Sequence, residues 1–287
     1  MGLVDTVGLV LHPQRNSKIA IDTIIEWAGG RGVTVLGLPE EIGRIDCSAV
    51  PVDACALVDR ANLLVSLGGD GTMLRTMRLV ANLCTPVLGV NLGRLGFLAE
   101  IDVDDLPRAL SAIDDHRYQV EARMAVSTTL PGGPAVIAFN DIALVRVPGK
   151  GLAAVAVSVQ GHPFVRYAAD AVIVATSTGS TAYSFAAGGP IVSPTVEGFL
   201  VVPAAAHSTF NRALVLSADE EVTLDLLPTC GELAVEVDGV VVGQLSAGDQ
   251  VTVTALRAAA QVVRLGDRTF YERARRKLRV NGSAEVD

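Results

Sequence analysis

The order of hydrophobic patterns along the first hundred residues constrains the possible folds of this chain more than any other feature. Apolar runs of strand length alternate there with segments whose apolar residues recur every three or four positions. The strand-like runs are 7–11, 33–36, 63–67 and 87–90, and the helical segments are 17–28 and 72–81. This alternation predicts a parallel sheet covered by helices, and therefore an α/β domain at the N-terminus.

The sequence pattern changes after Glu100, where helical periodicity gives way to short β-rich runs. These runs are 119–126, 136–139, 142–147, 153–159, 171–175, 213–216, 222–226, 233–237, 251–255 and 262–265. The Asp238-Gly239 pair between two of them predicts a tight hairpin. We therefore expect a second, mostly antiparallel β domain that begins near residue 100. A closing helix over 271–278 follows, and its basic residues are expected to face solvent.

The composition restricts the class of partner. The 287-residue chain is 50% hydrophobic and carries a formal net charge of −8, which argues against nucleic acid as a partner. No apolar run approaches the length that spans a bilayer, so we expect a cytoplasmic protein with no membrane partner. The cysteines are widely spaced and form no CxxC pair, which disfavours zinc and disulfide bonds and favours buried, reduced thiols. They are Cys47, Cys55, Cys84 and Cys230.

A glycine-rich turn between a strand-like run and a helical segment is the sharpest local signal. Its residues are Gly68, Gly69, Asp70, Gly71 and Thr72. Glycines at such a turn let a phosphate approach the backbone N–H groups and the positive end of the helix. A carboxylate there repels phosphate unless it holds a metal ion or accepts a proton from an attacking hydroxyl, and both are roles in phosphoryl transfer. Asp70 is therefore a candidate catalytic base, the alternative being that it only caps the next helix.

A second glycine-containing segment, 91–98, follows the strand-like run 87–90. It is expected at the same carboxyl edge of the predicted sheet as the first turn, where ligands of open α/β sheets collect. Arg94 lies between two glycines of this segment. Its guanidinium group is equally consistent with a phosphate contact and with a surface ion pair.

A hydroxyl-rich turn follows the strand-like run 171–175. Its candidate ligand-binding residues are Thr178, Thr181, Ala182 and Tyr183. Short donors and backbone N–H groups suit phosphates or ribose hydroxyls, and the tyrosine ring can stack on a base. A plain Ser/Thr-rich loop is the alternative, and the small residues at 186–189 favour binding.

Two weaker signals lie outside the three turns. Asn140 and Asp141 form an amide–carboxylate pair that can grip the two adjacent hydroxyls of a ribose. His207 is flanked by alanines, and from this pattern alone a buried core histidine is favoured over a ligand-binding one.

Read together, these motifs resemble the NAD kinase family over nearly the whole chain. The resemblance rests on GGDGT at 68–72, NLGRLGFL at 91–98, the Asn-acidic pair, DAVIVATSTGSTAYS at 170–184, the isolated His207 and FYERARRKL at 270–278, in that order. GGDGT is shared with lipid kinases and phosphofructokinases, whereas NLGRLGFL joined to TGSTAYS is specific to NAD kinases.

The resemblance implies an α/β N-terminal Rossmann-like domain over 1–100 and an all-β C-terminal sandwich domain over 101–267. The closing segment 268–287 would pack back on the first domain, and the active site would lie between the two. The family resemblance also implies a homodimer or homotetramer whose sites borrow residues from a neighbouring subunit.

The implied reaction is phosphorylation of the 2′-hydroxyl of the adenosine ribose of NAD by ATP, with Mg²⁺ or another divalent metal, to give NADP. Asp70 would be the general base. The phosphates of one nucleotide would be bound by Gly68, Gly69, Gly71, Thr72, Arg75 and Arg94. The dinucleotide would be bound by Asn140, Asp141, Asp170, Thr178, Thr181, Ala182, Tyr183 and His207.

The chain departs from the family at positions that would touch ligand. Asp141 stands where the family has Glu, Ala171 where it has Gly, Ser177 where it has Pro, and Ala186 where it often has Ser. A Cβ in place of glycine narrows a pocket or forbids a positive φ angle. These departures favour, as an alternative, a relative that phosphorylates another nucleoside or nucleotide. A non-catalytic dinucleotide sensor and a lipid kinase are further alternatives, which the intact Asp70 turn and the TGSTAYS segment respectively disfavour.

Overall fold

The structure is a computed structural model that describes residues 4–93, 96–266 and 269–279. The chain divides into two compact units: unit 1 comprises Met1–Ala122 and Ala260–Asp287, and unit 2 comprises Arg123–Ala259. Two strands, β7 (Gln119–Thr129) and β18 (Gln250–Arg264), run from one unit into the other. Residues 101–122, which the sequence analysis assigned to the second domain, therefore group with unit 1.

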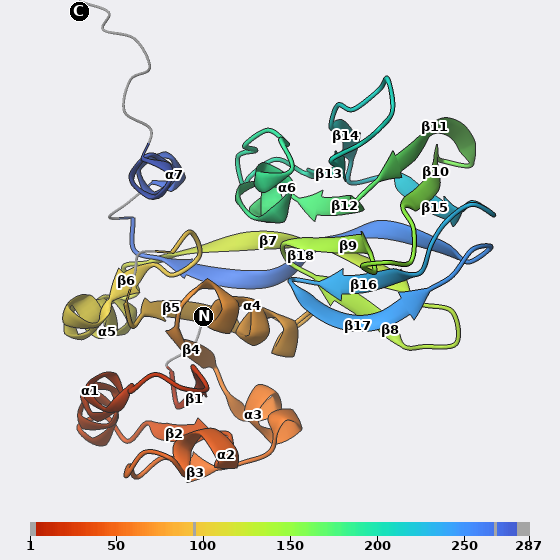
Figure 1. Cartoon of the computed structure of the whole chain (residues 1–287). Helices are drawn as coiled ribbons and strands as arrows, with labels where there is room; N and C mark the ends of the chain where they lie inside the picture. Colours follow the sequence, from red (N-terminus) through yellow and green to blue (C-terminus); the bar gives the residue numbers. More distant parts are fainter. Residues whose placement is uncertain (1–3, 94–95, 267–268, 280–287) are drawn as a thin grey trace, which may run out of the picture. The chain divides into compact units, whose positions relative to one another are not determined.

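Unit 1 contains a parallel sheet in the order β5-β4-β1-β2-β3 (Figure 1). Its strands are β1 (Thr6–Leu11), β2 (Thr34–Gly37), β3 (Val50–Pro51), β4 (Leu63–Gly68) and β5 (Pro86–Asn91). The short β6 (Ile101–Asp102) and the end of β18 also pair with β5 in parallel. Because β1, β4 and β5 are almost completely buried, their sequences are continuous apolar runs rather than alternating ones.

The helices of unit 1 alternate with these strands. They are α1 (Lys18–Gly29), α2 (Pro39–Ile42), α3 (Ala54–Arg60), α4 (Asp70–Leu79), the 3₁₀ turn η1 (Val103–Asp105), α5 (Leu106–Asp114) and α7 (Phe270–Leu278). Helix α5 was not predicted. It packs beside α1, where the Trp27 indole N–H donates to the Asp114 carboxylate at 3.0 Å. The α/β prediction for the N-terminal part is confirmed.

Unit 2 consists of antiparallel strands in two sheets that share one apolar core. One sheet has the order β14-β13-β12-β9-β16-β17, and the other joins β11, β10, β15 and β18, with β7 paired to β8. The remaining bounds are β8 (Ala135–Ala138), β9 (Asp141–Arg146), β10 (Ala153–Val159), β11 (His162–Ala169), β12 (Ala171–Thr176), β13 (Gly198–Ala204), β14 (Leu214–Ser217), β15 (Glu221–Leu226), β16 (Leu233–Val237) and β17 (Val240–Leu245). The prediction of an all-β C-terminal sandwich is confirmed.

Several local predictions can be compared with the structure. The Asp238-Gly239 hairpin is confirmed: Val237 pairs with Val240, and both turn residues have positive φ angles of 48° and 77°. Strands β11 and β13 were not predicted, and the two runs 251–255 and 262–265 form the single long strand β18. The expectation of buried thiols is wrong. Cys55 is exposed at the start of α3 and Cys84 is exposed in the segment before β5, while the other two cysteines are partly buried.

Candidate active site

The predicted glycine turn joins strand β4 to helix α4 in unit 1. Gly69 is the N-cap of α4 and no side chain caps the helix, so its first N–H groups are available to another acceptor. A Cβ atom placed on Gly69 or Gly71 would meet nothing within 4 Å, so the space beside this backbone is open. Gly68 has the opposite environment, because a Cβ there would lie 2.1 Å from the Thr72 hydroxyl. The turn thus combines free donors with room for an anion.

The Asp70 side chain does not cap its own helix, so the capping alternative is wrong. Its carboxylate reaches across to the second glycine segment, where it accepts the backbone N–H groups of Phe97 and Leu98, each at 3.0 Å. The Lys277 ammonium group lies 3.5 Å from the same carboxylate, whose side chain is 28% exposed. Asp70 is therefore held in one orientation and still reaches the surface of unit 1.

Gly96 makes this arrangement possible. A Cβ atom at Gly96 would lie 2.0 Å from an Asp70 carboxylate oxygen, closer than any side chain can approach. A glycine is therefore required at position 96, because the Asp70 carboxylate approaches its backbone so closely. The sequence pattern alone does not reveal this reason. Sequence reasoning also missed Phe97, Leu98 and Lys277 as neighbours of Asp70.

The two arginines predicted to bind phosphate have different outcomes. Arg94 lies outside the described residues. The Arg75 guanidinium group forms an ion pair with the buried Glu41 carboxylate and donates to the Leu11 carbonyl at 2.6 Å. Glu41 in turn accepts the Leu11 N–H at 2.5 Å. Arg75 thus ties α4 to α2 and to the end of β1, and a phosphate contact from it stays a prediction.

The Asn140-Asp141 pair lies in unit 2 at the start of β9, beside the β16–β17 hairpin. One Asp238 carboxylate oxygen accepts the backbone N–H groups of Asn140 at 2.7 Å and Asp141 at 3.3 Å, while the other accepts that of Phe139 at 3.3 Å. Asp141 itself is only 4% exposed. Burial, together with the nearby negative charges of Asp238 and Glu236, raises the pKa of Asp141 to about 7.

The hydroxyl-rich turn forms a 3₁₀ turn, η2 (Thr178–Thr181), followed by helix α6 (Tyr183–Ala186). Its backbone packs directly on the Asn140 region, because a Cβ at Gly179 would lie 2.0 Å from the Asn140 carbonyl oxygen. Thr178 is 7% exposed, and its hydroxyl has no hydrogen-bond partner within the described part of the chain. A buried hydroxyl without a partner is costly, so this atom points to a ligand group that would complete it.

The structure separates the predicted dinucleotide-binding residues into two groups along strand β12. Asn140, Asp141, Thr178 and the residues after it lie where β12 ends, because Asp141 pairs with Ala175. Asp170 directly precedes β12. Because a six-residue strand is about 20 Å long, Asp170 lies about that far from the residues at the end of β12. The Tyr183 ring packs against the apolar cluster over β12 and β13, which extends between the two groups.

Asp170 and His207 belong to the same end of this sheet. The Asp170 carboxylate pairs with Arg146 at 2.5 Å, and its N–H donates to the carbonyl of Ala204, three residues before His207. His207 is exposed and only its backbone N–H is held, by the Ala168 carbonyl at 2.8 Å. The prediction of a core histidine is therefore wrong, and the imidazole is accessible to a ligand.

Both halves of the chain match a known protein family. Residues 48–118 match the ATP-NAD kinase N-terminal domain, and residues 139–265 match the ATP-NAD kinase C-terminal domain. The chain belongs to the NAD kinase family. It is 36% identical to NAD kinase 1 of Streptomyces avermitilis, over 96% of this chain and 87% of that protein. It is 37% identical to the NAD kinase of Heliobacterium modesticaldum, over 95% of this chain and 98% of that protein.

Two solved structures share the fold of this chain. Yeast NADH kinase complexed with NADH superposes with a TM-score of 0.87 at 26% sequence identity, over 99% of this chain and 90% of that chain. An NAD kinase from Archaeoglobus fulgidus in complex with ATP gives a TM-score of 0.75 at 24% identity, over 96% of this chain and 100% of that chain.

Two departures from the family pattern are readily accommodated in the structure. Ala171 lies buried inside strand β12, paired with Ala204 and Val145, so its Cβ does not meet a positive φ angle. Ser177 has a φ angle of −57°, which proline also adopts, so a proline at this position would be compatible with that φ angle. A third departure, Asp141, is a buried carboxyl group on a side chain one methylene shorter than glutamate.

Proposed function

We propose that this chain is an NAD kinase that transfers the γ-phosphoryl group of ATP to the 2′-hydroxyl of the adenosine ribose of NAD, giving NADP. The observation that carries the proposal is the match to proteins named NAD kinase at 33–37% identity over nearly their full length. Asp70 at the open glycine turn supplies the carboxylate that such a transfer needs.

In the proposed reaction Asp70 is the general base. The acceptor hydroxyl gives its proton to the Asp70 carboxylate, and its oxygen forms a bond to the γ-phosphorus. The bond between that phosphorus and the bridging oxygen breaks, so ADP leaves. The geometry supports this role because the Asp70 carboxylate is fixed by two backbone N–H groups and remains partly exposed. A carboxylate has about four acceptor sites, so these two bonds and the contact from Lys277 still leave a lone pair for a proton.

The donor is assigned to the glycine turn of unit 1 and the acceptor to the predicted dinucleotide-binding residues of unit 2. The glycine turn of unit 1, with Thr72, would cradle the donor phosphates. In unit 2, Asn140 and Asp141 would hold the ribose or adenine of the acceptor, with the Thr178 hydroxyl, Tyr183 and His207 completing the dinucleotide site. The buried, unpartnered hydroxyl of Thr178 supports this assignment.

Mg²⁺ is the proposed metal. Among the residues that the structure describes, no group of three or more His, Cys, Asp or Glu side chains could hold a metal ion. Mg²⁺ does not need such a cage, because it is usually bound by one or two carboxylates together with substrate phosphates. Asp70 and the donor phosphates would provide that set. The ion would neutralise charge on the transferring phosphoryl group.

The direct test is to incubate the purified protein with NAD, ATP and MgCl₂ and to measure NADP. We expect NADP formation, and we expect Asp70→Asn to reduce turnover by at least about 100-fold while nucleotide binding persists, as for loss of a general base. Absence of NADP from folded protein would remove the claim about the acceptor. Full turnover by Asp70→Asn would remove Asp70 as the base.

A relative with a different acceptor is the second candidate. It is favoured by Asp141, whose short carboxyl group is buried where the family carries the longer glutamate. Parallel assays with NAD, NADH and a panel of nucleosides and nucleotides, all with the same donor, distinguish the two. A rate higher for another acceptor than for either dinucleotide would support the second candidate.

The setting of the enzyme is proposed on the resemblance and on composition. We infer a cytoplasmic homodimer or homotetramer with no nucleic-acid or membrane partner, and the net charge of −8 supports the absence of nucleic acid. Within the described residues, no helix combines the length and apolar character needed to cross a membrane. Light scattering coupled to size-exclusion chromatography would give the number of subunits.

A further inference from the structure

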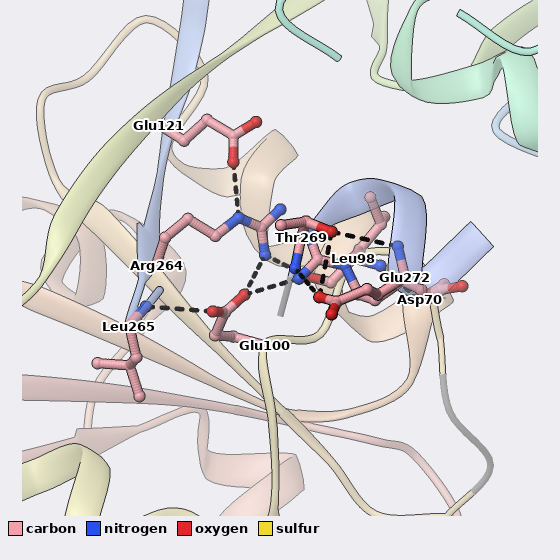
Figure 2. A network of polar contacts seen from close by, with 9 residues as sticks. Asp70, Leu98, Glu100, Glu121, Arg264, Leu265, Thr269 and Glu272 are labelled. Atoms are coloured by element: carbon pink, nitrogen blue, oxygen red, sulfur yellow. Dashed lines mark hydrogen bonds and ion pairs between the residues drawn. The ribbon is translucent and has the colours of Figure 1, made fainter. Parts of the chain in front are cut away.

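Helix α7 is fixed to unit 1 by a buried ion network (Figure 2). Glu100 accepts from Arg264 at 2.7 Å, from Arg273 at 3.2 Å and from the Leu265 N–H at 3.1 Å. Arg264 and Arg273 are 7% and 3% exposed, so the prediction of an entirely solvated basic helix is wrong for Arg273. The network fixes the rotation of the helix about its axis.

The start of α7 is also well defined. The Thr269 hydroxyl accepts the Glu272 N–H, and the Glu272 carboxylate accepts the Thr269 N–H, which is a capping box (Figure 2). Residues four apart on a helix lie on the same face. Arg273, which anchors the helix, and Lys277, one turn later, therefore project from the same side.

Lys277 uses this placement to reach the glycine turn. Its ammonium group lies 3.5 Å from an Asp70 carboxylate oxygen and 5.1 Å from the centroid of the Phe97 ring. Both partners are more than 170 residues away in sequence. The pair is partly exposed, at 37% and 28% of the side-chain surfaces, and such a pair contributes little to stability. Its position beside the proposed base therefore calls for another role.

The charges of the proposed site indicate that role. A donor triphosphate at the glycine turn would lie beside the Asp70 carboxylate, and the two negative groups repel. An ammonium group has three N–H donors, so Lys277 can contact Asp70 and still donate to phosphate oxygens. Two neighbouring arginines of α7 differ from Lys277, because Arg275 and Arg276 are exposed and form no ion pair within the described residues.

We propose that Lys277 is a donor-phosphate-binding residue that offsets the negative charge of Asp70 and so allows the base and the phosphates to occupy one turn. This inference rests on the proposed kinase function for its substrate class. Helix α7 thereby contributes a residue to the donor site. The buried Arg273–Glu100 ion pair holds the helix in the position that brings Lys277 to Asp70.

The test uses three variants of the full chain: Lys277→Met, Lys277→Arg and, as the matched control, Arg276→Met. Binding of sodium tripolyphosphate and of ATP with Mg²⁺ is measured by calorimetry, and KM for ATP and kcat are measured by NADP formation. Loss of one charge-assisted hydrogen bond corresponds to about a 10-fold weakening or more. We expect Lys277→Met to weaken tripolyphosphate binding and to raise the KM for ATP by about this factor, with a smaller change in kcat.

The controls separate charge from structure. Lys277→Arg keeps the charge and is expected to stay within about threefold of the wild type in phosphate binding, and Arg276→Met is expected to match the wild type. Thermal unfolding should be unchanged in all three. Equal binding by Lys277→Met and Arg276→Met would overturn the inference, as would an arginine variant as impaired as the methionine variant.

The binding measurement also separates this inference from the proposed function. Tripolyphosphate binding that depends on Lys277, in a protein that forms no NADP, would leave the inference standing and reject the kinase proposal. NADP formation together with tripolyphosphate binding that does not depend on Lys277 would support the kinase proposal and overturn the inference about Lys277. Absence of tripolyphosphate binding by the folded wild type would overturn the inference.

Discussion

Replacing Asp141 by asparagine is expected to stabilise the protein above neutral pH and to remove one component of its pH dependence. Asp141 is buried in unit 2 near the carboxylates of Asp238 and Glu236. Burial, with the nearby negative charges of Asp238 and Glu236, favours the protonated form of Asp141. Asp141 therefore keeps its proton at pH values below its raised pKa.

The direction in which the free energy of unfolding changes with pH follows from proton binding in the folded and unfolded states. The pKa of Asp141 rises from 3.8 in the unfolded chain to about 7 in the folded protein. Between these values the folded state keeps a proton that the unfolded state has lost, so the free energy of unfolding falls as pH rises. The slope is about 1.4 kcal/mol per pH unit, and the full effect is on the order of 4 kcal/mol as an upper limit. Above the folded pKa both states are ionised and the dependence ends.

The assay is urea unfolding followed by circular dichroism at pH 5, 6, 7 and 8. The free energy of unfolding of Asp141→Asn, relative to the wild type, should rise by about 3 kcal/mol from pH 5 to pH 8, because asparagine does not titrate. Glu221→Gln, an exposed carboxylate in the same unit, is the control and should change stability by less than about 0.5 kcal/mol at every pH. A difference between Asp141→Asn and wild type that does not vary with pH would refute the reasoning.

Two further substitutions test contacts that determine the site. Gly179→Ala is expected to lower the free energy of unfolding by at least about 2 kcal/mol, because its Cβ would lie 2.0 Å from the Asn140 carbonyl oxygen. The control is Gly29→Ala, whose Cβ would meet nothing within 4 Å and which should be neutral or slightly stabilising. Urea unfolding measures both. Glu100→Ala is expected to cost about 3–5 kcal/mol, because it leaves Arg264 and a second buried arginine without their shared carboxylate, and unchanged thermal unfolding would contradict that assignment.

Local sequence patterns predicted most of the secondary structure. Apolar runs identified strands such as β10 and β16, and the Asp238-Gly239 pair identified the hairpin between β16 and β17. Strand β13 was missed although its sequence is a continuous apolar run, whereas the signals for β11 and α5 were weak. Strand β11 begins with a histidine and a proline and is half exposed, and helix α5 follows a run of acidic residues near the expected domain boundary.

Part of the candidate site was predictable because it depends on local sequence signals. The glycine turn 68–72 and the hydroxyl-rich turn after β12 each depend on neighbours in sequence, because backbone freedom and strand ends are local properties. The roles of Gly96 and Asp238 were not predictable from pattern. Each is defined by an approach between segments far apart in the chain, to Asp70 and to the backbone of residues 139–141.

By itself, the sequence determined the α/β and β parts, the two turns and the family resemblance, because periodicity and turn chemistry are encoded in adjacent residues. Only the tertiary structure decided the environments of the ionisable groups. It buried Asp141 beside two other carboxylates, exposed His207, and brought Lys277 to Asp70 across 207 positions of sequence. Burial and Coulomb interactions depend on distance in space, and folding alone sets that distance.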